Sequence, residues 1–231
     1  MPRLWKTSDP QDEDFSLQLY RNYLDHERIG MELKTDARSA LIIVDVQKDF
    51  CPGGALPVPK GAEVVPILNR YIERFKRVGG PVYATRDLHP PDHVSFKSQG
   101  GIWPAHCVKG TDGAEFHPAL KLPRNTRIVS KATERNQEAY SGFQGTDLQQ
   151  DLKKKDVETA FVGGLATDYC VKSTVLDALG FGFKAVLLKD AVRGVNLKPD
   201  DSEKAIEEMV KKGAKEAFLS DLSLSESSIP S

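Results

Sequence analysis

The stretch TAFVGGLATDYC, residues 159–170, begins as an apolar run, turns at two glycines and continues into a helical pattern over residues 168–179. An apolar run of this length followed by glycine predicts a buried strand over residues 159–162, so the stretch forms a strand–helix unit. The same pattern predicts further buried strands over residues 40–44, 81–84, 127–129, 185–188 and, as a short last strand, 216–219. Helical patterns lie between several of these strands, over residues 61–78, 147–154 and 202–212. The alternation predicts an α/β fold, a three-layer αβα arrangement around a mostly parallel, six-stranded, Rossmann-like sheet.

The segment that precedes these strands has a different character. Residues 1–36 are polar and acidic at first, and then Phe15, Leu19 and Tyr23 recur at helical spacing. This spacing predicts a helix over residues 12–26. We therefore divide the chain into an N-terminal helical extension, residues 1–36, and one α/β domain, residues 37–231. The extension either packs on that domain or mediates assembly into a homo-oligomer.

Composition excludes several classes of partner. The 231 residues include 32 Lys and Arg against 33 Asp and Glu, so the formal net charge of -1 favours no nucleic acid as partner. No apolar run approaches the roughly 20 residues that span a bilayer, and the N-terminus lacks the apolar stretch of a signal peptide. Three cysteines are an odd number and do not suggest a disulfide framework. A cytoplasmic protein with no membrane partner is the expectation.

Chemically reactive side chains follow separate predicted strands. Ligands bind beyond the carboxyl ends of parallel strands, and Asp45, Lys131 and Cys170 lie at three such ends. A thiolate is a nucleophile, so a helix N-terminus and the charge of Lys131 would lower the pKa of Cys170, while Asp45 would accept its proton. The alternatives are a buried core thiol, a lysine on the surface and an aspartate that caps a helix or forms an ion pair. Cys51 and Cys107 follow no strand into a helix and are interpreted as structural.

A second group of side chains has the chemistry of a metal site. Asp87 and His89 come at the end of another strand, two residues apart, and can therefore face the same ligand. His93 and His106 lie in the long loop 88–125, and spacing does not say which of them completes the set. A carboxylate with two imidazoles suits zinc, manganese or iron. The alternative is a set of loop histidines held by hydrogen bonds.

Five ordered segments of the chain resemble a known family. They are ALIIVDVQKDFCPGGALPV, ATRDLHPPDHVSF, GIWPAHCVKGT, KATERNQEAYSGF and VGGLATDYCVKST, which begin at residues 40, 84, 101, 131 and 162. Over about residues 40–222 the chain resembles the nicotinamidase/pyrazinamidase branch of the isochorismatase-like cysteine hydrolases. Leu88 stands where many members have Trp, and Lys48 where many have Asn or Thr, but neither change removes a functional group.

The resemblance implies an amidohydrolase that converts nicotinamide, and also pyrazinamide, to the acid and ammonia through a cysteine thioester in NAD salvage. It implies one divalent metal ion, zinc first, with manganese or iron as alternatives. For His93 it leaves two alternatives, a further metal ligand or a residue that contacts the ligands. The implied residues are a catalytic triad of Asp45, Lys131 and Cys170; metal ligands Asp87, His89 and His106; an oxyanion hole from the N–H groups of Ala166 and Cys170; a cis peptide bond between Leu165 and Ala166; and a ring-binding pocket of Phe50, Trp103 and Tyr140.

Two other functions compete with this one. A metal-independent relative, an N-carbamoyl amidohydrolase or an isochorismatase, shares the fold and part of the triad but lacks the aspartate–histidine cluster. A catalytically inactive binding protein of the same fold is the alternative from another class. The acid, lysine, cysteine and metal-binding pattern together favour the nicotinamide hydrolase.

Overall fold

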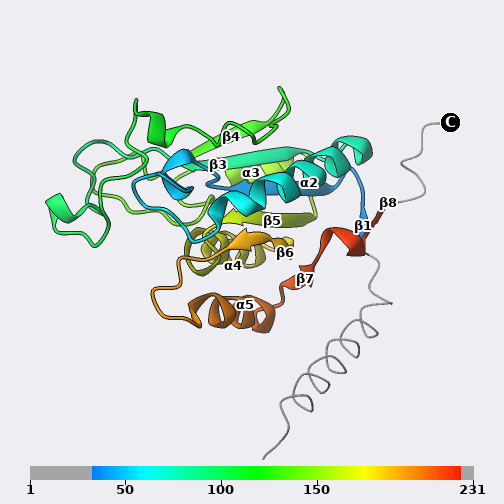
Figure 1. The fold of residues 1–231 in the computed structure, drawn as a ribbon. Coiled ribbons are helices and arrows are strands. Elements are labelled where there is room, and N and C mark those ends of the chain that lie inside the picture. The colour runs from blue at the N-terminus through cyan, green and yellow to red at the C-terminus, as the bar shows by residue number, and fades with distance from the viewer. Residues whose placement is uncertain (1–32, 225–231) are drawn as a thin grey trace, which may run out of the picture. The chain divides into compact units, whose positions relative to one another are not determined.

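The computed structural model describes residues 33–224, and the helix predicted over residues 12–26 lies outside this part. Its main element is a six-stranded sheet of order β4-β3-β2-β5-β6-β7, in which every neighbouring pair is parallel (Figure 1). The strands are β2 (Ser39–Val44), β3 (Val82–Asp87), β4 (Arg127–Lys131), β5 (Thr159–Leu165), β6 (Lys184–Arg193) and β7 (Lys215–Ala217). The predicted strands and the α/β class are therefore confirmed.

The four predicted helices are also present. They are α2 (Val64–Val78), α3 (Leu148–Lys154), α4 (Lys172–Gly180) and α5 (Asp201–Lys211). Short turns of 3-10 helix are η1 (Lys48–Phe50), η2 (Gly61–Glu63), η3 (Lys97–Gln99), η4 (Asp112–Ala114) and η6 (Leu219–Asp221). The helix predicted from residue 168 differs, because a π-helical turn, η5 (Thr167–Val171), precedes α4.

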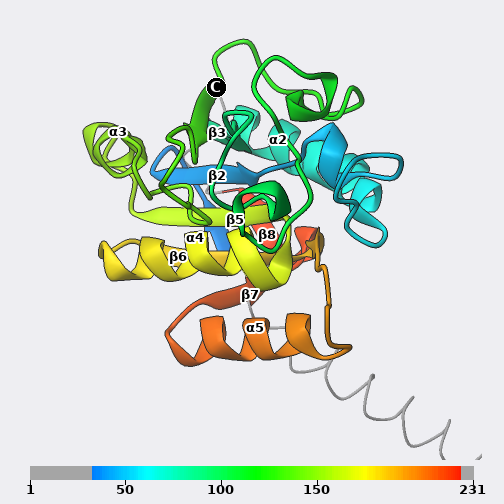
Figure 2. The ribbon, with the colours of Figure 1, turned by 90° about the vertical axis from the view of Figure 1, so that its left-hand side faces the viewer.

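Alternating side chains along the strands build a core on each face of the sheet. Phe161 of β5 packs edge-on against Phe75 of α2, with ring centroids 5.3 Å apart. Its neighbour Val162 points the other way and joins a buried cluster that includes Val175 of α4 and Met209 of α5. Helix α2 thus covers one face, while α3, α4 and α5 cover the other, which gives the predicted three layers (Figure 2).

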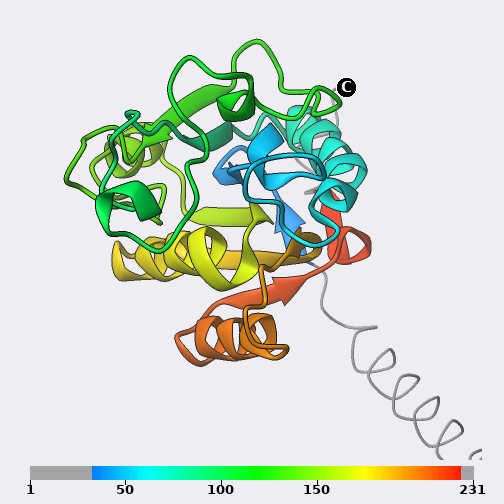
Figure 3. The same ribbon diagram turned by 60° about the vertical axis from the view of Figure 1, so that its left-hand side comes forward.

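The two ends of the sheet carry different structures. Figure 1 shows a small sheet of β1 (Leu33–Thr35) and β8 (Leu222–Leu224) at the end where β2 begins. The long connections after β2 and β3 gather at the opposite end, where the parallel strands finish (Figure 3). In the part of the chain that the structure describes, no helix combines the length and apolar character needed to cross a membrane.

Candidate active site

Lys131 lies at the centre of the reactive side chains. Its Nζ is 3.0 Å from Asp45 Oδ2, 2.5 Å from Asp87 Oδ1 and 3.5 Å from Cys170 Sγ. It also donates a hydrogen bond to the carbonyl of Ala139 at 3.0 Å. Only 1% of Lys131 is exposed, so the interpretation as a surface lysine is wrong. One buried ammonium therefore pairs with two buried carboxylates from other strands, which leaves one negative charge in excess.

Parallel strand ends bring these groups together. Asp87 and Lys131 are the last residues of β3 and β4 and are paired in register. Asp45 follows β2 with a φ of 49°, and Thr85 donates a hydrogen bond to its Oδ1 at 2.6 Å. Gly164 of β5 allows the close approach of β2, because a Cβ there would come within 2.1 Å of the carbonyl oxygen of Val44. The sheet itself thus sets the spacing of the candidate triad.

Burial and charge set the protonation of these groups. Burial raises the pKa of Asp45, although Lys131 pulls it down. Burial alone would raise the pKa of Asp87 as well, but Lys131 and His89 hold that pKa below its usual value. Burial would lower the pKa of Lys131, and the two carboxylates raise it well above its usual value instead. The lysine is therefore charged, and Asp45 is the more basic of the two carboxylates.

The expectation of a low thiol pKa was wrong. Burial raises the pKa of Cys170 well above its usual value; Lys131 opposes this, and the carboxylates of Asp45 and Asp87 add to it. Two carboxylates outnumber one ammonium around the sulfur, and Cys170 lies in a π-helical turn instead of at an α-helix start. The resting thiol keeps its proton, so it needs a base at the moment of attack.

Asp87, His89 and His106 form a cluster with the geometry of a metal site. One ligand atom from each lies within 4.8 Å of the others, and all three residues are buried. His89 Nδ1 lies 3.3 Å from the carbonyl of Ala132, and His106 Nδ1 lies 2.8 Å from the carbonyl of Pro104. A carbonyl can only accept, so each Nδ1 carries a proton, and in the neutral imidazole each Nε2 then offers a lone pair to a metal ion.

One atom of this cluster needs a partner. His89 Nε2 is buried without a hydrogen bond among residues 33–224, and it lies 3.7 Å from Asp87 Oδ2. A buried polar atom left in this state is costly unless another group satisfies it. A divalent metal ion fits this position, because two Nε2 atoms and a carboxylate are the donors that such ions take.

His93 lies beside the cluster with different contacts. Its ring centroid is 4.2 Å from that of His89, but its Nδ1 is 2.7 Å from Ser95 Oγ and its Nε2 is 3.1 Å from the carbonyl of Gln137. Both ring nitrogens are thus engaged with protein atoms. Of the two histidines that spacing left open, it is His106 that lies in one cluster with Asp87 and His89.

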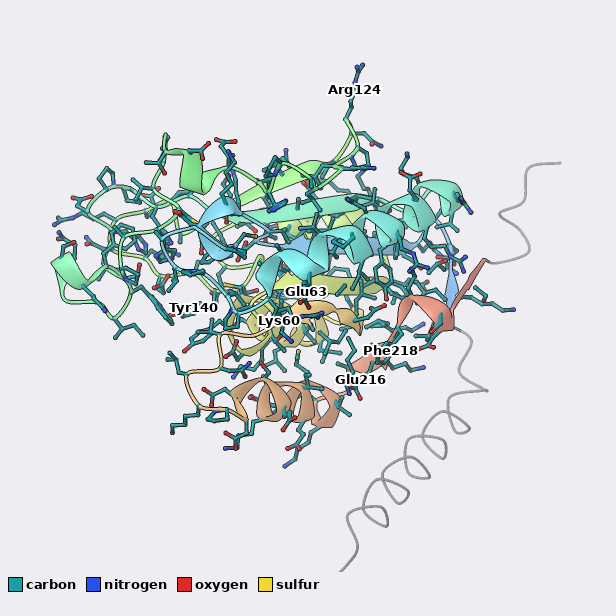
Figure 4. All side chains as sticks on the ribbon, in the orientation of Figure 1. Lys60, Glu63, Arg124, Tyr140, Glu216 and Phe218 are labelled. Atoms are coloured by element: carbon teal, nitrogen blue, oxygen red, sulfur yellow. The ribbon has the colours of Figure 1, made fainter. Side chains whose placement is uncertain are left out.

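An aromatic pocket opens onto Cys170 and onto two members of the candidate metal cluster, Asp87 and His106. Phe50, Trp103 and Tyr140 line it, as the resemblance implied, and Trp103 Nε1 donates a hydrogen bond to the Tyr140 hydroxyl at 3.1 Å. Figure 4 shows Tyr140 at the loop-bearing end of the sheet. The empty space of the pocket, including the part open to solvent, is about 390 Å³. Its full lining is Phe50, Leu56, Val58, Asp87, Trp103, His106, Tyr140, Leu165, Ala166, Tyr169, Cys170 and Val195.

The backbone before Cys170 has the expected cis bond. The peptide bond between Leu165 and Ala166 is cis. Ala166 and Cys170 line the same pocket. The two N–H groups proposed for the oxyanion therefore belong to residues that border the space where a substrate would bind.

Sequence patterns missed several residues of this site. Gln47 lies two residues after Asp45, and its side chain accepts from the Asp87 N–H at 2.8 Å and donates to the Asp87 carbonyl at 2.8 Å. A polar residue so close to a buried strand end was a usable signal. Val195 had no such signal, because β6 runs beyond the predicted strand 185–188 as far as Arg193. Tyr169 lay inside the quoted stretch, next to Cys170, without a predicted role.

The isochorismatase domain matches residues 39–217 of the chain. The chain belongs to the isochorismatase family. Within this family, a nicotinamidase of Escherichia coli (strain K12) is 40% identical over 203 residues, which cover 79% of this chain and 95% of the relative. The family resemblance inferred from the five segments is therefore confirmed.

Solved structures of relatives agree with the fold. A pyrazinamidase of Pyrococcus horikoshii in complex with zinc is 52% identical, with a TM-score of 0.76 over 79% of this chain and 99% of that chain. PnC1 from L. infantum, in complex with nicotinate, is 31% identical, with a TM-score of 0.77 over 84% of this chain and 100% of that chain. The isochorismatase-like fold is thus shared with relatives solved with zinc or with nicotinate.

Proposed function

We propose that this protein is a nicotinamidase, which hydrolyses nicotinamide to nicotinate and ammonia and also accepts pyrazinamide, in NAD salvage. The observation that carries the proposal is the meeting of two groups on one aromatic pocket. Cys170, with Lys131 and Asp45 behind it, borders the same space as the metal-ligand candidates Asp87 and His106. The names of the E. coli and P. horikoshii relatives support the same substrate class.

Different pocket residues bind different parts of the substrate. Phe50, Trp103 and Tyr140 present ring faces and edges to a flat heteroaromatic ring. A divalent ion held by Asp87, His89 and His106, for which we propose zinc with manganese or iron as alternatives, supplies a Lewis-acidic position for the ring nitrogen when bound. The carboxamide then points toward Cys170.

The triad residues carry out the chemistry. Asp45 takes the proton of Cys170 as the sulfur attacks the carboxamide carbon, and its raised pKa suits it to this role. The N–H groups of Ala166 and Cys170 stabilise the oxyanion, a contribution worth about 3–4 kcal/mol per donor in comparable sites. Asp45 returns the proton to the amide nitrogen, ammonia leaves and a thioester remains. Asp45 then takes a proton from water as the water oxygen attacks the thioester. As the C–S bond breaks, Asp45 returns that proton to the sulfur, so the thiol re-forms, and the nicotinic acid released loses its own proton to solvent as nicotinate.

An ammonia-release assay over a panel of carboxamides tests the function. We expect turnover of nicotinamide and pyrazinamide, and a kcat/KM for benzamide at least about 100-fold lower, because benzamide lacks the ring nitrogen. A chelator should abolish turnover and added divalent metal should restore it. Hydrolysis of N-carbamoyl compounds by metal-free protein would favour the metal-independent relative instead, and no ammonia from any carboxamide would favour an inactive binding protein.

Histidine substitutions test the ligand set. His89→Ala removes one of three proposed donors, so we expect the metal affinity to fall by at least about 100-fold, measured as metal content after dialysis against a competing chelator. His93→Ala is the matched control, since both His93 nitrogens already contact protein atoms and the variant should keep one equivalent of metal. Metal loss from His93→Ala equal to that from His89→Ala would make His93 a ligand.

The remaining proposals concern the chain as a whole. We also propose that residues 1–36 form an N-terminal extension, which packs on the domain or mediates a homo-oligomer, and that residues 37–231 form the hydrolase domain. Cys51, Cys107 and Cys170 are all free thiols, which supports a reducing compartment such as the cytoplasm.

A further inference from the structure

Two connections meet beside the nucleophile. The turn η5 follows β5 and carries Asp168 and Cys170, while a loop that contains Val195 and Asn196 follows β6. Asp168 joins them, because its Oδ1 accepts the N–H of Val195 at 2.9 Å and its Oδ2 accepts the N–H of Asn196 at 2.8 Å. Asp168 is only 9% exposed, and it forms no ion pair with a described residue. Both carboxylate oxygens therefore serve the backbone of the neighbouring loop.

Further close contacts hold the loop after β6 next to Asp168 and the start of α5. Asn196 has a φ of 52°, and its Oδ1 accepts the N–H of Ser202 at the start of α5 at 2.9 Å. A Cβ on Gly194 would come within 1.8 Å of Ser202 Oγ and 3.1 Å of Asp168 Oδ1, so the loop lies close to both. The paired register of β5 and β6 runs only to Leu165 and Arg193, so beyond these residues the ladder no longer holds the loop in place.

Val195 connects Asp168 with the substrate pocket. Val195 lines the pocket together with Cys170, and Asp168 is two residues from Cys170 in the chain. We propose that Asp168 is a positioning residue that fixes Val195 as a wall of the pocket, and that this wall restricts the ring substituents a substrate can carry. The inference rests on the proposed function for its substrate and extends it to the residue that sets the pocket width.

Asparagine at position 168 tests the contact with little change in shape. Asp168→Asn keeps one acceptor oxygen but turns an NH₂ group toward the second backbone N–H, so one of the two hydrogen bonds is lost. We expect the KM for nicotinamide to rise about 10-fold with kcat changed less than about 3-fold, because the wall moves while the triad stays. The ratio of kcat/KM for 5-methylnicotinamide to kcat/KM for nicotinamide should rise about 10-fold. A single methyl group in a pocket changes the discrimination between two substrates by a factor of this size.

Val195→Ala and the double variant show whether both residues act through one wall. Val195→Ala should raise the same substrate ratio, and adding Asp168→Asn to it should change the ratio less than about 2-fold further. Multiplicative effects in the double variant would overturn the proposal. Asp190→Asn is the matched control, since the Asp190 carboxylate also accepts two hydrogen bonds, from the Tyr71 hydroxyl and the Leu219 N–H, at a place that does not line the pocket.

If Asp168→Asn does not fold, two other measurements test the proposal. In the unaltered protein, the N–H groups of Val195 and Asn196 should be protected from hydrogen exchange by at least about 10-fold relative to an open loop. Free exchange at both would overturn the proposal, as would a Val195→Ala variant with an unchanged substrate ratio. If the unaltered protein releases no ammonia from nicotinamide, the proposed function fails first; if it does and Asp168→Asn behaves like Asp190→Asn, only this inference fails.

Discussion

Cys170→Ala should reduce ammonia release from nicotinamide by about 10⁴-fold or more, as removal of a catalytic nucleophile does in other hydrolases. The substitution removes only the sulfur, which lies 3.5 Å from Lys131 Nζ at the pocket wall. The aromatic lining and the metal-ligand candidates are untouched. Nicotinate binding, measured by calorimetry on the metal-loaded variant, should therefore stay within about 3-fold of the unaltered protein.

Cys51→Ala is the matched control for this experiment. Cys51 is also a free, buried cysteine, 3% exposed, and it does not line the pocket. Its replacement should leave kcat/KM within about 2-fold of the original value, because it touches no reacting group. Residual turnover of more than a few per cent in Cys170→Ala, or an equal loss in both variants, would contradict the assignment of the nucleophile.

Lys131→Met should destabilise the metal-free protein by about 3–5 kcal/mol and abolish turnover. Methionine has nearly the length of lysine but no charge, so Asp45 and Asp87 would lose the ammonium that they share at 3.0 Å and 2.5 Å. Two buried carboxylates without a counter-charge are costly unless they take up protons. For a chain of this size the loss corresponds to a Tm lower by roughly 6–20 °C, which calorimetry or circular dichroism would measure.

An exposed lysine serves as the comparison. Lys76 pairs with Glu73 three residues earlier on α2, at 3.0 Å, and both side chains are exposed. Lys76→Met should change the free energy of unfolding by no more than about 0.5 kcal/mol, as expected for a surface ion pair. If the two variants unfold at the same temperature, Lys131 is not the counter-charge of the site. A loss of stability in Lys131→Met that disappears on metal loading would mean that the metal takes over the role.

The arrangement of the fold was predictable because local patterns and general topology agree. Apolar runs separated by helical patterns specify a parallel sheet, and parallel strands place their carboxyl ends on one edge. Asp45, Asp87 and Lys131 follow successive predicted strands, so their place on one edge of the sheet followed from the sequence, whereas their contact depends on the strand order β4-β3-β2. The start of α4 was misplaced, because nothing in residues 167–171 distinguishes a π-helical turn from the first turn of an α-helix.

Four stretches of sequence thus placed Cys170 after β5 and the side chains of Asp45, Asp87 and Lys131 at the same edge of the sheet. The tertiary structure decided which atoms are free to act. His93 and His106 cannot be told apart as metal ligands from the sequence. In the structure, His93 Nε2 contacts the carbonyl of Gln137, whereas His106 contacts the carbonyl of Pro104 through Nδ1, so its Nε2 can face a metal ion. The pKa of Cys170 rises for a similar reason, since burial and the charges around the sulfur depend on residues from three other strands. Hydrogen-bond partners and desolvation arise only when distant segments pack together, and no local pattern in TAFVGGLATDYC encodes them.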